Sequence, residues 1–245
     1  MQGKKVSSIT PVIGGFRVRD DKGAENTAKK VILATGVTDV IPEKTGFKDA
    51  FGRGMFWCMW CDGNDYKNKK VVIYGPIYSA IGSALNFRKL TTDLTIMTGG
   101  PITPEDKKKA EEKWPGWEKL LKDTYKIQVL DVDINQVERT GASDEPRDDK
   151  YQVKTTRGNY EANGILIHVP TKQTSHLPQQ LHLKMTSDRK IEVARNMESS
   201  IAGIYAVGDA NNDESTNAYH AMWSAKRAAV NIHGRLDHSS DIFTS

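Results

Sequence analysis

The feature that most constrains the fold is a short apolar run that enters a glycine and is followed by a helix. Val71 to Tyr74 form a strand-length apolar run that ends at Gly75. Ser79 to Leu90 has apolar residues at helical spacing, and Leu94 to Met97 is again short and apolar. Strand, turn, helix and strand in this order predict a βαβ unit, and therefore an α/β fold with parallel strands.

Further strands and helices are expected on both sides of this unit. The first residues predict a small β-meander with strands at 6–12, 16–19 and 30–34, which ends in Ala34-Thr35-Gly36. The other expected elements are an interrupted helix at 103–123, strands at 127–132, 151–155, 165–169, 190–193 and 203–207, and a helix at 217–236. Residues 139–149 read as a polar loop. The order of elements indicates one α/β domain inserted into another.

Composition excludes several classes of protein. The net charge of +4 arises from 35 basic and 31 acidic residues spread along the chain, so we expect no nucleic-acid partner. The apolar runs are far shorter than the roughly 18 residues of a membrane span, so we expect no membrane association. The N-terminus has basic residues without an apolar stretch behind them, which argues against a secretory signal and favours a cytoplasmic location.

The sequence contains two cysteines, Cys58 and Cys61. Their spacing suits either a redox-active disulfide or half of a metal site. A zinc site needs four ligands, and none of the six histidines has ligand-like spacing to the pair, so we expect no bound metal. Two cysteines that merely pack in a core are the remaining alternative.

The neighbours of the cysteine pair favour redox chemistry. Trp57 and Trp60 would partly shield the sulfurs, and a helix that begins at the pair would favour the thiolate of one cysteine. Asp62 follows Cys61 directly, and a carboxyl group there could pass a proton to or from the dithiol or its substrate. Because Asp-Gly is also a common turn pair, Asp62 could equally be a turn residue.

Four motifs follow one another along the chain: Ala34-Thr35-Gly36, Cys58-x-x-Cys61-Asp62-Gly63, the glycine turn after 71–73, and Gly203 to Asp209. In this order and at these intervals they resemble the low-molecular-weight thioredoxin reductases, which are FAD-dependent pyridine nucleotide-disulfide oxidoreductases. The tryptophan-rich cysteine segment is most similar to fungal thioredoxin-reductase-like proteins. These include the dithiol oxidases that form disulfide-bridged metabolites such as gliotoxin.

The resemblance implies an α/β protein with two Rossmann-like, three-layer domains. Residues 44–170 would be an NAD(P)-type domain that carries the cysteine pair, inserted into a FAD-binding domain built from 1–43 and 171–245. The family begins with a strand, a Gly-x-Gly-x-x-Gly turn and a helix that hold the FAD pyrophosphate, and this chain starts after them. We therefore expect an N-terminally truncated FAD domain with weakened affinity for the flavin.

The resemblance also implies a role for each motif residue. The FAD-binding residues would be Ala34, Thr35, Gly36, Gly208, Asp209, Asn217 and Ala218. Asp209 would hold the ribityl chain, and the helix that starts at Asn217 would direct its first amides at the pyrimidine oxygen. Taken alone, Gly208-Asp209 is equally compatible with a simple turn. Cys61 would face the flavin, Cys58 would exchange with the substrate, and Asp62 would be the acid–base group.

The expected nicotinamide site departs from the family pattern. Where the family has Gly-x-Gly-x-x-Ala, this chain has Gly75, Ile77 and Ala80 at the matching positions. Ile77 would put a branched side chain where the pyrophosphate lies, and Pro76 removes an amide donor. The arginine pair that holds the 2′-phosphate of NADPH is also absent, because a threonine and two glycines follow the next strand. We therefore doubt that NADPH is a cofactor.

These departures favour dithiol oxidation, in which electrons pass from a small dithiol through Cys58 and Cys61 to FAD and then to oxygen. NADPH-dependent reduction of a thioredoxin-like disulfide protein is the alternative activity. A catalytically inactive chain that acts as a binding or regulatory protein is an alternative of another class, suggested by the missing pyrophosphate turn. Dimers are the habit of the family, so a homodimer is a further expectation.

Overall fold

The computed structural model describes residues 3–213 and 216–241, and the chain forms two compact units. The inserted unit is Ile41–Pro170, and the split unit combines Met1–Val40 with Thr171–Ser245. The strands of the split unit that border the two crossings pair with each other. These are β5 (Val37–Asp39) and β14 (Thr171–Gln173), which run antiparallel.

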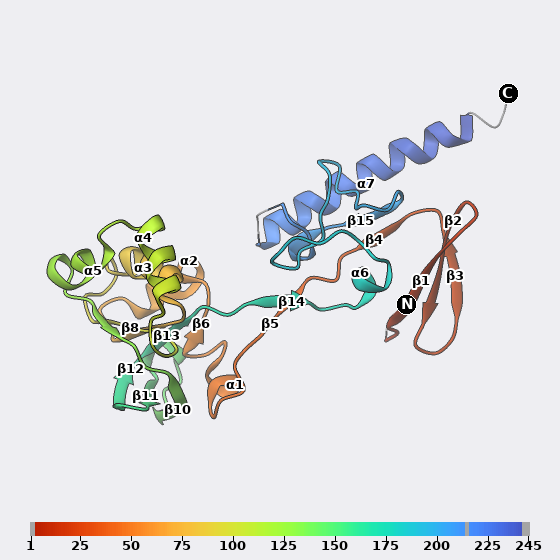
Figure 1. Cartoon of the computed structure of the whole chain (residues 1–245). Helices are drawn as coiled ribbons and strands as arrows, with labels where there is room; N and C mark the ends of the chain where they lie inside the picture. Colours follow the sequence, from red (N-terminus) through yellow and green to blue (C-terminus); the bar gives the residue numbers. More distant parts are fainter. Residues whose placement is uncertain (1–2, 214–215, 242–245) are drawn as a thin grey trace. The chain divides into compact units, whose positions relative to one another are not determined.

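The inserted unit has three layers around one parallel sheet of order β6-β13-β7-β8-β9. Its strands are β6 (Met55–Phe56), β7 (Val71–Tyr74), β8 (Leu94–Met97), β9 (Gln128–Leu130) and β13 (Gly164–Ile167). One face carries α3 (Ile77–Phe87), α4 (Pro104–Lys113), α5 (Trp117–Lys119) and the π-helical turn η2 (Leu120–Thr124) (Figure 1). The other face carries the antiparallel strands β10 (Ile134–Gly141), β11 (Lys150–Thr155) and β12 (Gly158–Ala162).

Alternation along β7 explains how one strand contributes to both outer layers. Val71 and Ile73 pack in the core on the helix side, whereas Val72 and Tyr74 pack in the core beneath β10 to β12. Successive side chains of a strand point to opposite faces, so a strand covered on both faces is a continuous apolar run. The run at 71–74 is therefore apolar throughout because both faces of the sheet are covered.

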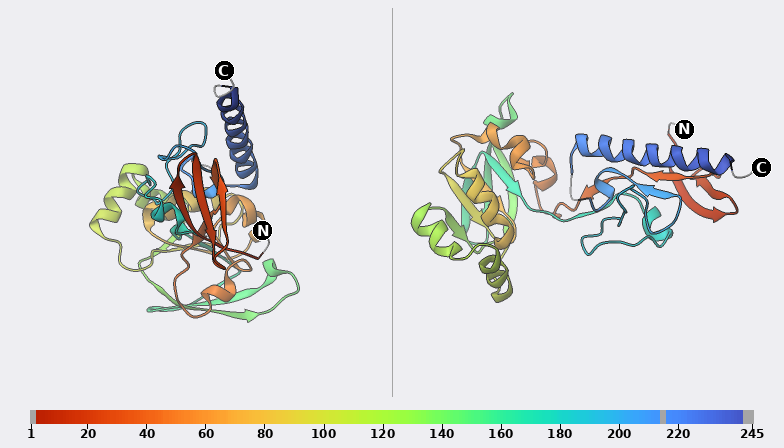
Figure 2. Two further views of the ribbon diagram at one scale, coloured as in Figure 1. Left: turned by 90° about the vertical axis from the view of Figure 1, so that its right-hand side faces the viewer. Right: turned by 90° about the horizontal axis from the view of Figure 1, so that it is seen from above.

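The split unit consists of a meander, a parallel strand pair and a long helix. The meander is β1 (Val6–Val12), β2 (Gly15–Asp20) and β3 (Glu25–Ala28). The parallel pair is β4 (Val31–Leu33) and β15 (Ile204–Ala206), and the helix is α7 (Ala218–Asp241). Figure 2 shows α7 running alongside the strand pair.

β15 divides its side chains between two cores of the split unit. Ile204 and Ala206 pack with Leu33 of β4 in one core. Tyr205 packs with Ala228 of α7 in the other. Other short elements are α1 (Phe47–Ala50), α6 (Leu177–Gln180) and the 3-10 turns η3 (Pro146–Asp148) and η4 (Gly208–Ala210). Within residues 3–213 and 216–241, no helix is both long enough and apolar enough to cross a membrane.

Three expectations about strands are wrong. The third strand of the meander is Glu25–Ala28, whose polar edge-strand residues gave no apolar pattern, while 30–34 leaves the meander to pair in parallel with β15. The expected loop at 139–149 begins inside β10, which ends at Gly141. Residues 190–193 form no strand in the described chain, and Ile191 makes isolated bridges to Met185 and Asn211 instead.

Candidate redox site and cofactor-binding residues

The two cysteines form a disulfide at the start of a short helix. α2 (Met59–Asp62) begins directly after Cys58, whose Sγ is bonded to that of Cys61. Cys58 is the N-cap residue, with an extended backbone, and its Sγ accepts a hydrogen bond from the Cys61 amide at 3.1 Å. An amide donor in this position would stabilise a thiolate on Cys58 once the disulfide is reduced.

The disulfide segment is held on both sides. Before it, β6 pairs in parallel with β13. After it, the 3-10 helix η1 (Gly63–Tyr66) stacks the Tyr66 ring on Phe56, with centroids 4.8 Å apart. The Tyr66 hydroxyl also donates to the Arg53 carbonyl at 3.0 Å. These contacts fix the ends of a segment whose middle is open to solvent, since Trp60 is 82% exposed and does not provide the shielding expected of it.

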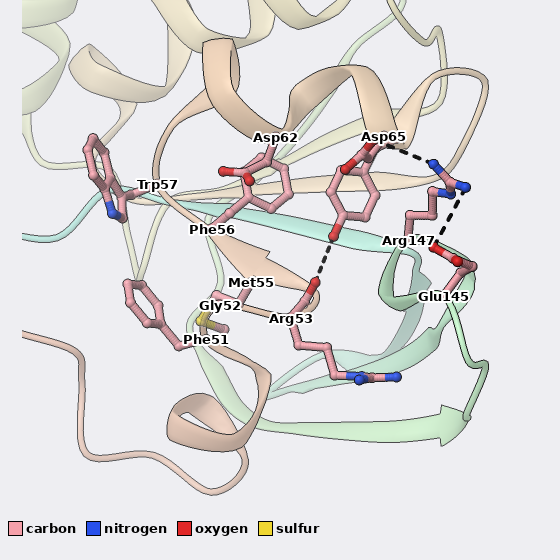
Figure 3. Close-up of a pocket in the computed structure, with 11 residues that line it drawn as sticks. Phe51, Gly52, Arg53, Met55, Phe56, Trp57, Asp62, Asp65, Glu145 and Arg147 are labelled. Carbon is pink, nitrogen blue, oxygen red and sulfur yellow. Dashed lines mark hydrogen bonds and ion pairs between the residues drawn. The ribbon is translucent and has the colours of Figure 1, made fainter. Parts of the chain in front are cut away.

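Asp62 occupies the last position of α2, and it lines a cavity beside the disulfide segment (Figure 3). Partial desolvation raises the pKa of Asp62 above its ordinary value, and the neighbouring Asp65 carboxylate raises it further. The Asp62 side chain makes no capping hydrogen bond to η1, so it is not held in the manner of a turn residue. A carboxyl group with a raised pKa is suited to proton exchange.

The cavity has a volume of about 310 Å³. Trp57 and Asp62, the residues that flank the two cysteines in sequence, both line it. Its other lining residues are Phe51, Gly52, Arg53, Met55, Phe56, Asp65, Tyr66, Glu145 and Arg147. The disulfide segment therefore borders a cavity that combines aromatic rings with charged groups of both signs.

A buried carboxylate anchors one wall of this cavity. Asp149 is 0% exposed and accepts hydrogen bonds from Arg53 Nε at 2.5 Å and from the Ser143 amide at 2.8 Å. Arg139 Nε lies 3.0 Å from the same carboxylate. Burial alone would raise the pKa of Asp149, but the hydrogen bonds from Arg53, Ser143 and Arg139 outweigh burial and lower it to about 2. The guanidinium of Arg53 is thus held in place with its charge compensated.

The motifs expected to bind FAD lie at two adjacent strand ends in the split unit. Ala34-Thr35-Gly36 follows β4 and Gly208-Asp209 follows β15, while the Val207 amide donates to the Leu33 carbonyl at 3.0 Å. Because β4 and β15 are parallel neighbours, both motifs leave the carboxyl edge of the sheet, where open α/β sheets bind ligands. Asn217 caps the helix that begins at Ala218, because its Oδ1 accepts from the His220 amide at 2.8 Å.

Two features of this edge fit a bound cofactor. The Thr35 hydroxyl is buried without a hydrogen-bond partner among the described residues, and Thr35 lines a mainly apolar cavity of about 340 Å³. Gly36 has a φ of +63° and no atom within 4 Å of the place that a Cβ would take. Gly208 has a φ of +65°. Glycines in this conformation let a backbone pass close to a bulky group.

The nicotinamide motif lies at the carboxyl end of β7. Gly75 has a φ of +148°, and a Cβ there would meet His168 at 2.7 Å. Ala80 is fully buried in the core on the helix side. Ile77 is only 1% exposed, its side chain packs into the same core, and it also lines the cavity next to the motif.

A further cavity lies next to this motif, and its charge bears on phosphate binding. It has a volume of about 240 Å³ and is lined by Pro76, Ile77, Thr98, Gly99, Gly100, Pro101, Ile102 and Asp106. None of these described lining residues is basic. Asp106 forms a capping box with Thr103 at the start of α4 and places a carboxylate at the cavity. Phosphate groups are bound by cationic side chains or by backbone amides, and this lining offers no cationic side chain.

Comparison with known proteins agrees with this geometry. The model of the family described as "Pyridine nucleotide-disulphide oxidoreductase" matches residues 1–225. The chain belongs to this family.

This chain is similar to two fungal proteins. It is 36% identical to a probable thioredoxin reductase of Arthroderma benhamiae over 95% of this chain and 62% of the relative. It is 27% identical to thioredoxin reductase sirT of Leptosphaeria maculans over 79% of this chain and 59% of the relative. The chain thus spans about three-fifths of the length of these curated relatives.

Solved structures confirm the fold class of this chain. The thioredoxin reductase of Streptococcus pyogenes matches with a TM-score of 0.79 at 18% identity, over 96% of this chain and 74% of that one. The thioredoxin reductase of Giardia duodenalis matches with a TM-score of 0.73 at 20% identity, with the same coverage of both chains. The α/β fold with two Rossmann-like domains is therefore as the sequence predicted.

The sequence did not point to most of the residues that line the cavity next to the disulfide segment. Phe51, Arg53 and Tyr66 lie close to the cysteines in sequence. The glycine that follows Arg53 directly before β6 is the one sign in the local sequence that other residues pack closely against this segment. Glu145 and Arg147 come from the polar segment after β10, and nothing in their pattern connects them to the cysteines.

Proposed function

We propose that this chain is a FAD-dependent thiol–disulfide oxidoreductase that oxidises a small dithiol through Cys58 and Cys61. One observation carries the proposal: the disulfide lies at a helix start, where the Cys61 amide donates to Cys58 Sγ, beside an acidic group of raised pKa at Asp62. This arrangement supplies a sulfur that can carry negative charge and a proton-exchanging group next to it.

The proposed reaction begins when a substrate thiolate attacks Cys58 Sγ. The Cys58–Cys61 bond breaks, Cys61 leaves as a thiolate, and a mixed disulfide joins the substrate to Cys58. The second substrate thiol passes its proton to Asp62 and attacks the substrate sulfur of the mixed disulfide, which releases Cys58. The substrate leaves as a disulfide without two electrons and two protons. The two cysteines hold those electrons as thiolates, while one proton rests on Asp62 and the other entered solvent when the first substrate thiol ionised.

FAD is the proposed acceptor of these electrons, with oxygen as the terminal oxidant. The split unit would hold the flavin at the carboxyl edge of β4 and β15. Thr35 would use its unpartnered hydroxyl, Asp209 its carboxylate, and the helix at Asn217 its first amides. When bound, the flavin supplies two-electron acceptor chemistry that cysteine side chains alone lack.

The direction of the reaction is proposed from the cavity next to β7. Its described lining carries no basic group and one carboxylate, which disfavours the phosphates of NADPH as the electron source. The names of the relatives favour a second candidate, NADPH-dependent reduction of thioredoxin or another disulfide protein. Mixing the flavin-loaded protein with NADPH separates the two, because rapid loss of flavin absorbance at micromolar NADPH would favour the reductase.

Oxygen uptake tests the proposed activity. With added FAD and dithiothreitol as the model dithiol, the protein should consume oxygen, and both Cys58→Ser and Cys61→Ser should abolish this uptake. Retained turnover in either variant would remove the disulfide from the mechanism. No uptake by the unsubstituted chain with saturating FAD would contradict the activity.

A homodimer and a cytoplasmic location are also proposed. Support for a second copy comes from α7, where Tyr219, Met222, Trp223 and Val230 are exposed by half or more of their surface. Sedimentation would show a dimer for the unsubstituted chain and a monomer for Met222→Glu if this face is used. Localisation of the tagged protein in cells tests the second proposal.

A further inference from the structure

The cavity lined by Trp57 and Asp62, which are the sequence neighbours of Cys58 and Cys61, has features that discriminate among substrates. We propose that it selects small aromatic disulfides and dithiols that carry no negative charge. This inference rests on the proposed function, because it names the substrate class of the same disulfide. Size, aromatic lining and charge each contribute to it.

Size limits what can enter the cavity. A volume of about 310 Å³ lies at the lower end of small-molecule sites, which run from roughly 300 to 1,000 Å³. It accommodates one ring system with its substituents. A folded protein could present at most one side chain to it, so the cavity itself is suited to a small molecule.

The lining favours a flat aromatic ring. The cavity is lined by the rings of Phe51, Phe56, Trp57 and Tyr66, of which Phe51 directly follows α1 and Phe56 ends β6. Figure 3 labels the first three of these rings. Phe56 and Tyr66 are stacked with an interplanar angle of 8°, and Tyr66 is tied to the Arg53 carbonyl, so these two rings are fixed in advance. Preset rings bind an aromatic ligand without the entropic cost of ordering side chains.

Charge disfavours an anionic substrate. The cavity has three carboxylates, those of Asp62, Asp65 and Glu145, against two guanidinium groups. Arg53 is already engaged by Asp149 at 2.5 Å. Arg147 lies 3.9 Å from Asp65 and 3.6 Å from Glu145, as the dashed lines in Figure 3 mark. Every lining guanidinium in the described chain thus has a carboxylate partner, and an entering anion would meet an excess of negative charge.

The test needs neither flavin nor NADPH. The protein is reduced with dithiothreitol, freed of reductant, and mixed with one of three disulfides. These are 4,4′-dithiodipyridine (neutral, aromatic), 5,5′-dithiobis(2-nitrobenzoate) (dianionic, aromatic) and 2-hydroxyethyl disulfide (neutral, aliphatic). Cys58 attacks the probe and releases one thiol, and Cys61 then attacks Cys58 and releases the second. Each rate is divided by the rate of the same probe with free dithiothreitol, which removes differences in intrinsic reactivity.

The neutral aromatic probe should have the highest normalised rate, and the dianionic probe should lag behind it by about tenfold. Glu145→Gln should narrow that gap about threefold, because Glu145 would no longer compensate the positive charge of Arg147. Glu161→Gln is the matched control, since Glu161 is 80% exposed on β12 and does not line the cavity. It should leave the ratio unchanged.

Phe51→Leu should lower the advantage of the neutral aromatic probe over the aliphatic one. Tyr160→Leu is its control, because both residues are partly buried against the same core and only Phe51 lines the cavity. Equal normalised rates for all three probes in the unsubstituted protein would overturn the inference and leave the proposed function intact. If the reduced cysteines react with no probe, the proposed function itself fails.

Discussion

The Cys58 sulfur accepts a hydrogen bond from the Cys61 amide at 3.1 Å, so a hydrogen bond connects the same two residues that the disulfide joins. This hydrogen bond forms because Cys58 caps α2 in an extended conformation that turns its sulfur toward the first free amides of the helix. It distinguishes the two cysteines chemically, although Cys61 is the more exposed of the pair.

This asymmetry predicts different reactivity of the two thiols. In the reduced protein near neutral pH, Cys58 should be alkylated by iodoacetamide several-fold faster than Cys61, because the amide stabilises its thiolate. The single variants Cys61→Ser and Cys58→Ser isolate each thiol, and mass spectrometry follows the alkylation. Faster reaction of Cys61 would mean that exposure controls reactivity. It would contradict the assignment of substrate exchange to Cys58.

Asp62→Asn should slow thiol–disulfide exchange and stabilise the protein at the same time. The folded-state pKa of Asp62 is raised, so the folded chain holds this proton more tightly than the unfolded chain does, and the charged form weakens folding above that pKa. The variant should therefore be more stable than the unsubstituted chain at pH 7, with the difference disappearing below the ordinary carboxyl pKa.

Urea unfolding at pH 7 and at pH 3, together with exchange rates at pH 7, checks this pair of effects. Asp65→Asn is the control for charge alone, and it should affect exchange much less. An Asp62→Asn protein that exchanges at the unsubstituted rate would remove Asp62 from the chemistry.

Asp149 should make the inserted unit sensitive to acid. Its pKa is lowered to about 2, so its contribution to stability is complete above the unfolded-state value near 4 and is lost as the pH falls toward 2. The shift corresponds to about 2 kcal/mol of unfolding free energy. The unsubstituted chain should therefore lose stability between about pH 4 and pH 2 more steeply than Asp149→Asn.

Removal of the Asp149 side chain should lower the free energy of unfolding by more than its protonation does. Asp149→Ala leaves Arg53 and Arg139 without their shared carboxylate and should destabilise the protein by about 3 kcal/mol in urea unfolding at pH 7. Asp148→Ala changes the neighbouring residue, which is 55% exposed and paired with Lys69, and should cost less than about 1 kcal/mol. Equal effects of the two substitutions would show that burial of Asp149 is unimportant.

The sequence predicted the parts of this molecule whose structure depends on local pattern. Val71 to Tyr74 is apolar at every position because the strand is covered on both faces, so the pattern predicted both a strand and the turn at Gly75. By contrast, Glu25 to Ala28 has no apolar alternation, and the strand exists because β2 offers it a hydrogen-bonding edge.

Most of the cavity could not be predicted, because its charged wall depends on long-range contacts. Arg53 and Asp149 are 96 positions apart and meet through folding of the β10–β11 connection against the disulfide segment. Neither residue belongs to a motif. The tryptophans beside the cysteines show a second limit, since proximity in sequence suggested that both shield the sulfurs, whereas Trp60 extends into solvent.

Anaerobic reduction of the flavin tests the central claim most directly. The protein is loaded with FAD, freed of excess flavin, and mixed with dithiothreitol in the absence of oxygen while flavin absorbance is recorded. The account predicts bound flavin that loses its absorbance in the unsubstituted protein and keeps it in Cys58→Ser and in Cys61→Ser. Failure to retain any flavin, or bleaching at the same rate in the two variants, would contradict the claim that this disulfide links a dithiol to FAD.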